Sequence, residues 1–192
     1  MKSIVAALAA LTIATVSAAA DEPDNGTPIA QIIAAVAHKT NRKFLIDPRV
    51  EAKVHLIGEE PSQLSFNELL TILELYGYVT AESAGYVLVL PDANARQSAQ
   101  PLLTKGQTFP DAQIVNHTIT VQNVPAAQLV PILRPLLPQY AHLAALPCEN
   151  TLLIVDRYAN VKRIEAIVKA LDVGGTPYKP EKCEGPSKRN DS

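Results

Sequence analysis

Apolar residues recur at helical spacing along residues 29–37, which predicts an amphipathic helix near the start of the chain. Thr27 is placed to cap the free backbone N–H groups of this helix, and Asn41 suits its left-handed end. Two runs rich in apolar and β-branched residues, 43–46 and 52–57, then predict strands on either side of a polar turn. The chain therefore opens with a helix and two strands.

A second helix is predicted over residues 66–76 by its apolar stripe and by a capping box before it. In this box Ser65 bonds the backbone N–H of Glu68, whose side chain reaches back to the backbone of Ser65. Residues 78–82 and 86–90 predict two short strands joined by a tight turn. The first half of the chain is thus α-β-β-α-β-β.

The second half has a different order of elements. Its pattern predicts a strand, a helix, two strands and a final helix, over 116–122, 125–138, 143–149, 151–156 and up to residue 171. Pro131 and Pro135 should bend the first of these helices or end it early, because proline removes intrahelical hydrogen bonds. We expect Asp156 to cap the last helix.

The stretches between these patterned segments divide the chain. The segment before the second half is polar, with Pro and Gly, and is typical of a linker. The end of the chain is rich in Gly, Pro and charge. We predict a signal peptide, a first domain, a linker, a second domain and a flexible tail, over residues 1–20, 21–91, 92–113, 114–172 and 173–192.

The first twenty residues have the pattern of a secretory signal peptide. One Lys is followed by an uncharged, Ala-rich apolar run, and small residues lead to a cleavage position after Ala20. The alternative is an uncleaved membrane anchor, but the run is short of the roughly 20 apolar residues that a span needs. We therefore expect an exported chain, with no transmembrane segment after cleavage.

Composition then excludes one class of partner. The sequence of 192 residues is 47% hydrophobic and 19% charged, with a formal net charge of −2 and no Trp. A nucleic-acid-binding protein favours a basic face and aromatic stacking residues. We expect no nucleic-acid partner.

Export also bears on Cys148 and Cys183. In an oxidising compartment two such cysteines favour a disulfide over a metal site, because zinc requires four ligands and no His is nearby. The alternative is a free, buried Cys148.

No pattern of catalytic, metal-binding or cofactor-binding residues is present. The four His, at 38, 55, 117 and 142, are scattered, and no nucleophile elbow or P-loop occurs. Asp47-Pro48-Arg49 could suggest a small charged site, but Pro suits a turn between strands and Asp can cap it. We expect a structural turn, with partner contact as the alternative, and no catalytic residue, metal or cofactor.

The residues resemble the N-terminal periplasmic domains of secretins, most closely those of the type II secretion outer-membrane channel. In the first half the segments that carry this resemblance are FLIDPRVEAKVHLIG, ELLTILELYGY and GYVLVLPDANARQ. In the second half the segment is LVPILRPLLPQYAHLAALPCENTLLIVDRYANVKRIEAIVKALD. The first domain also resembles the signalling domain of TonB-dependent receptors.

The resemblance implies an α/β (α+β) protein of two small domains. The first would be a secretin N0-type fold with two helices between small sheets. The second would be a KH-like βαββα sandwich of the N1 type. We expect the family's leading strand to be missing or very short, and the pore domain to be absent.

The implied function is that of a non-catalytic periplasmic interaction module, held at the outer membrane through partners. The expected partners are components of a type II secretion or pilus assembly, such as a secretin or its inner-membrane partner, with self-assembly as a further possibility. The alternative is an envelope signalling or ligand-binding module. We expect partner binding by strand addition at two sheet edges. These edges are formed by Val54, His55, Leu56 and Ile57, and by Val87, Leu88 and Val89.

Overall fold

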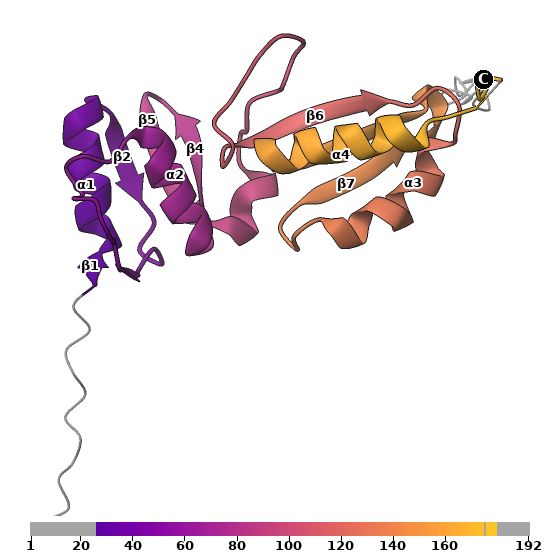
Figure 1. Cartoon of the computed structure of the whole chain (residues 1–192). Helices are drawn as coiled ribbons and strands as arrows, with labels where there is room; N and C mark the ends of the chain where they lie inside the picture. Colours follow the sequence, from indigo (N-terminus) through magenta and orange to yellow (C-terminus); the bar gives the residue numbers. More distant parts are fainter. Residues whose placement is uncertain (1–25, 175, 180–192) are drawn as a thin grey trace, which may run out of the picture.

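The computed structural model of the chain describes residues 26–174 and 176–179, which form two α/β domains (Figure 1). The elements of the first domain follow the predicted order after one additional short strand. They are β1 (Thr27–Pro28), α1 (Ile29–Thr40), β2 (Lys43–Ile46), β3 (Lys53–Val54), α2 (Phe66–Leu75), β4 (Tyr78–Ser83) and β5 (Tyr86–Pro91).

Two sheets flank the helices of the first domain. The larger sheet has the order β2-β5-β4, with β2 parallel and β4 antiparallel to β5, and the smaller one pairs β1 with β3. The strands predicted on either side of the polar turn therefore belong to different sheets. The second of them is only two residues long, because the chain leaves the sheet after Val54. β1 is also two residues long within the described part of the chain, and whether it corresponds to the family's leading strand stays a prediction.

The apolar stripes of α1 and α2 meet in one core. Ile32 and Val36 of α1, and Leu69 and Leu73 of α2, are at most 1% exposed and pack with Val54 and Val89 from the two sheets. The predicted capping box of Ser65 and Glu68 is present at the start of α2. The predicted cap of α1 is wrong, because Thr27 belongs to β1 and α1 has no side-chain cap.

The second domain has the predicted βαββα order. Its elements are β6 (Ile114–Thr120), α3 (Ala126–Leu133), β7 (His142–Leu146), β8 (Thr151–Arg157) and α4 (Tyr158–Leu171), with short 3₁₀ turns η2 (Arg134–Leu136) and η3 (Pro147–Glu149). The antiparallel sheet has the order β6-β8-β7. Apolar residues of α3 and α4 pack with one face of this sheet, which includes Leu152 and Ile154.

Proline shapes α3 as the sequence predicted. The α-helix ends at Leu133, two residues after Pro131, and continues as the 3₁₀ turn that contains Pro135. The predicted cap of α4 is wrong, because Asp156 lies in β8, fully buried, and Arg157 is the residue before the helix. Asp156 instead accepts a hydrogen bond from the N–H of Arg157, 2.7 Å away.

The segment between the domains is more ordered than the linker that the sequence predicted. It begins with the 3₁₀ helix η1 (Asp92–Gln97), in which Ala95 is buried. Farther along, Leu103 and Pro101 exchange backbone hydrogen bonds with Asn116, so the segment lies beside the outer edge of β6. These contacts join residues that are far apart in sequence, so the local sequence pattern did not reveal them.

Candidate protein-interaction surface

Sheet edges decide where a partner strand can be added, because only there are backbone N–H and C=O groups unpaired. β5 is the central strand of its sheet and pairs with β2 on one side and β4 on the other. The prediction that Val87, Leu88 and Val89 form an edge is therefore wrong. Val87 and Val89 are also buried, and they face the helices instead of solvent.

The open edge of this sheet is β2. Within the part of the chain that the structure describes, β2 pairs only with β5. Asp47 donates its N–H to the carbonyl oxygen of Val89, 3.0 Å away, which places the backbone groups of Asp47 on the β5 side. Because these groups alternate along a strand, those of Phe44 and Ile46 point to the open edge. Two N–H and two C=O groups are thus available to a fourth strand.

The outer face of the sheet beside this edge is apolar. Leu45 lies opposite Leu88 and is 52% exposed, and Tyr86 on β5 is 38% exposed. Edge strands that avoid pairing are usually interrupted by proline, a bulge or inward-pointing charge. β2 has neither a proline nor an inward-pointing charge: Lys43, its first residue, is exposed, and the three residues after it are apolar. The edge and its outer face are therefore suited to strand addition.

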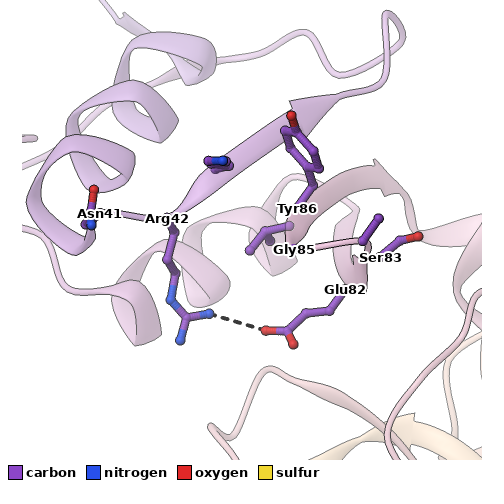
Figure 2. A pocket seen from close by; sticks show the side chains of 9 residues that line it. Asn41, Arg42, Glu82, Ser83, Gly85 and Tyr86 are labelled. Atoms are coloured by element: carbon purple, nitrogen blue, oxygen red, sulfur yellow. Dashed lines mark hydrogen bonds and ion pairs between the residues drawn. The ribbon is translucent and has the colours of Figure 1, made fainter.

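A cavity of about 480 Å³ opens at the beginning of β2, between the end of α1 and the β4–β5 turn. Figure 2 shows Arg42 and Glu82 reaching toward each other across it. The Arg42 Nη1 and Glu82 Oε1 atoms are 3.4 Å apart. The guanidinium also lies over the ring of Phe66, 4.2 Å from its centroid, which fixes the side chain at the mouth of the cavity.

Positive charge gathers at this end of the edge. Lys43 follows Arg42 directly, and its Nζ is 5.9 Å from the ring centroid of Tyr86. Among the described residues Lys43 has no carboxylate within ion-pair distance. The arrangement favours a partner segment that carries an acidic residue where it meets the start of β2. We did not predict this surface from sequence, although lysine on a short strand is a usual mark of an edge.

The charged residues of the turn after β2 bond to each other and stabilise the turn. The carboxylate of Asp47 accepts three hydrogen bonds from Arg49, from its backbone N–H, its Nε and its Nη2, each 2.9 Å long. The Arg49 side chain, with its backbone N–H, lowers the pKa of Asp47 to about 2. The Asp47 carbonyl oxygen accepts the N–H of Val50, which closes the turn. Both charges are thus engaged with each other.

The other predicted contact lies at the small sheet. Val54 pairs with Thr27 and is 4% exposed, so its side chain belongs to the core. His55, Leu56 and Ile57 follow the strand instead of extending it. Leu56 packs against the core, whereas Ile57 is 96% exposed. Only His55 and Ile57 present exposed side chains here, and their role in binding stays a prediction.

The described residues contain no group of three His, Cys, Asp or Glu side chains placed to hold a metal ion. The ring of His117 lies between Leu103 and Glu165, 3.3 Å from the carbonyl oxygen of the first and 3.9 Å from the carboxylate of the second. None of the helices that the structure describes has the length and apolar character that a membrane span requires. Cys148 lies in η3, while Cys183 and the cleavage position Ala20 fall outside the described residues.

Two family models match the chain, one for each domain. Residues 25–89 match the GspD-like N0 domain, and residues 116–176 match the short domain of bacterial type II/III secretion systems. The first of these ranges contains β2 and its open edge.

Similar proteins are found among the secretins. The secretin XcpQ of Pseudomonas aeruginosa is 35% identical over 152 residues, which cover 77% of this chain and 22% of XcpQ. The secretin GspD of Vibrio cholerae is 29% identical over 157 residues, covering 78% of this chain and 23% of GspD. The chain thus spans less than a quarter of the length of these relatives.

A solved structure is similar over the same region. It is the type II secretion outer membrane complex of Klebsiella pneumoniae, described as PulD, PulS and the PulC HR domain. The match has a TM-score of 0.64 and 28% identity, and covers 78% of this chain and 26% of the other.

Proposed function

Since the chain belongs to the secretin family through the N-terminal domains that it shares with XcpQ and GspD, we propose that it is a non-catalytic interaction module of the periplasm. It binds protein components of a type II secretion or related envelope assembly. The observation that carries this proposal is the open β2 edge in the domain that matches the N0 model.

The binding mode is addition of one extended strand to β2. The outward backbone groups of Phe44 and Ile46 provide hydrogen bonds, and the exposed Leu45 side chain provides apolar contact. Lys43, which has no carboxylate within ion-pair distance among the described residues, selects a partner with an acidic residue at the matching end. His55 and Ile57, at the small sheet, are a separate predicted contact.

The Klebsiella complex suggests the partner, because a PulC HR domain is present with PulD. We propose that an HR domain of this kind, from the same bacterium, binds the first domain. A secretin and a second copy of this chain are the other partners to be compared.

Binding is tested with the mature chain and the purified HR domain in titration calorimetry. Burial of a leucine side chain contributes about 1.5–3 kcal/mol, so Leu45→Lys should weaken binding by roughly tenfold or more. Leu75→Lys is the matched control, because Leu75 lies on α2 of the same domain and is 79% exposed. It should leave the affinity within about twofold of the wild type.

Two results would contradict the proposal. If Leu45→Lys and Leu75→Lys bind equally well, the β2 edge is not the binding surface. If the mature chain binds neither the HR domain, nor a secretin, nor itself, the assignment to such an assembly fails.

A further inference from the structure

Arg157 is a cation buried at the boundary between the two domains. It is the last residue of β8 and is only 3% exposed. Burial of a guanidinium costs free energy unless its N–H donors are paired. The hydrogen-bond partners of Arg157 therefore indicate its structural role.

Those partners come from both sides of the boundary. Nε donates to the hydroxyl oxygen of Tyr140 at 2.8 Å, and Nη1 donates to the carbonyl oxygen of Ala112 at 3.0 Å. Nη2 donates to the carbonyl oxygen of Tyr78 in the first domain at 3.3 Å. Nε also lies 3.0 Å from the Glu74 carboxylate, on α2 of the first domain. One side chain thus joins the first domain, the connecting segment and the second domain.

The boundary also holds a small apolar cluster. Val79 of β4, Ala95 of η1, Ile114 of β6 and Val155 of β8 are each at most 8% exposed. Apolar contact holds surfaces together without fixing their direction. The planar fork of an arginine does fix direction, since its donors require acceptors at set angles. Arg157 therefore supplies directional bonds across the boundary that the apolar cluster does not.

Tyr140 is suited to this role. A tyrosine phenol is neutral at physiological pH and adds no charge beside the guanidinium, and burial raises the pKa of Tyr140 further, to about 12. The Arg157 guanidinium lies 5.3 Å from the ring centroid of Tyr140, which orients the fork further.

We propose that Arg157 is a latch that holds the two domains in one orientation and that the Glu74 contact is the part that opens. The side chain of Glu74 is 44% exposed, whereas that of Arg157 is 3% exposed. Water and ions reach the contact from the Glu74 side. When Glu74 is released, the buried Arg157 guanidinium keeps only backbone carbonyl and phenol acceptors. Its attachment to the first domain is then weaker, because the ion pair with α2 is lost.

The test measures backbone N–H residual dipolar couplings on the full mature chain. Domains that are locked together share one alignment tensor, and domains that move independently do not. Arg157→Met keeps an unbranched, flexible side chain in the apolar part of the site and removes the charge and the donors. Arg163→Met is the matched control, because Arg163 is exposed on α4 and its one hydrogen bond among the described residues goes to Leu136 within the second domain.

We expect one shared tensor for the wild type and Arg163→Met, and two different tensors for Arg157→Met, with both domains still folded. The proposal is overturned if the two domains of Arg157→Met still share one alignment tensor. It is also overturned if Arg163→Met loses the shared tensor as Arg157→Met does. If Arg157→Met does not fold, Glu74→Gln decides, since it alters an exposed side chain of the first domain. Partial loss of the shared tensor supports the latch, and full retention overturns it.

Discussion

Asn150 joins the turn before β8 to the connection between β6 and α3, and we predict that Asn150→Ala is strongly destabilising. The side chain is 4% exposed. Its Oδ1 accepts the N–H of Ala126 at 2.7 Å, and its Nδ2 donates to the carbonyl oxygens of Val121 and Val124 at 2.7 and 3.0 Å. Ala126 begins α3, and the preceding Pro125 provides no side-chain cap. Asn150 therefore caps this helix from a distant part of the sequence.

The expected magnitude follows from these three hydrogen bonds. Each contributes about 1 kcal/mol net, so their loss costs about 3 kcal/mol. The backbone adds to this, because Asn150 has a φ of 46°, where alanine is less favourable by about 1–2 kcal/mol. Together the loss is about 4–5 kcal/mol, a large share of the stability of a small domain.

Asn41→Ala separates the backbone contribution from the hydrogen bonds. Asn41 ends α1 with a φ of 52°, and its exposed side chain makes no hydrogen bond with another described residue. We expect this variant to lose only about 1–2 kcal/mol. Asn150→Gly accepts the positive φ without strain and should still lose about 3 kcal/mol through the hydrogen bonds.

Urea unfolding followed by far-UV circular dichroism measures all three variants on the mature chain. The decisive quantity is the difference in unfolding free energy between Asn150→Ala and Asn41→Ala. A difference below about 0.5 kcal/mol would refute the reasoning, because the buried network would then contribute no more than an exposed helix end.

Three further predictions concern local chemistry. Ser65→Ala removes the capping box and should lower the unfolding free energy by about 1 kcal/mol in urea, with an unchanged value counting against it. Arg49 lowers the pKa of Asp47 from 3.8 to about 2, so the folded state gains stability above pH 3.8 and loses it as the pH falls through about 2. Asp47→Asn should therefore show a smaller fall in melting temperature over that window than the wild type, and an equal fall would contradict the pairing. For the predicted disulfide of Cys148 and Cys183, mass spectrometry of the unreduced mature chain should find no thiol that can be alkylated, and finding two would exclude it.

The sequence predicted those features whose physical cause is local. Ser65 and Glu68 are three residues apart, so their capping box requires only that α2 begin there. The β4–β5 turn is similar, because Ala84 and Gly85 both adopt positive φ in a two-residue connection. Pro131 ends α3 early because proline has no backbone N–H to donate to the helix. In each case the deciding atoms lie within one turn of chain.

The features that were missed depend on residues far apart. Thr27 has the chemistry of a helix cap, but pairing with Val54 places it in a strand instead. The open edge is β2 and not β5, because β2 and β4 pair with the two sides of β5. The order of strands in a sheet cannot be read from the local sequence pattern. Arg157 bonds residues 17, 45 and 79 positions away. Its burial could be known only once both domains were assembled.

The two edges of the first sheet have opposite roles, and this links the proposed binding surface to the proposed latch. β2 is open, whereas β4 faces the connecting segment, where Gln100 donates to the carbonyl oxygen of Thr80, and provides Tyr78 to the latch. A strand added to β2 therefore contacts the first domain far from Arg157.

If the partner binds the first domain alone, Arg157→Met leaves its affinity unchanged while the domains become independent. If the partner also reaches the second domain, the same variant weakens binding, because the domains are no longer held in position before the partner arrives. The affinity of Arg157→Met thus distinguishes a partner of one domain from a partner of both.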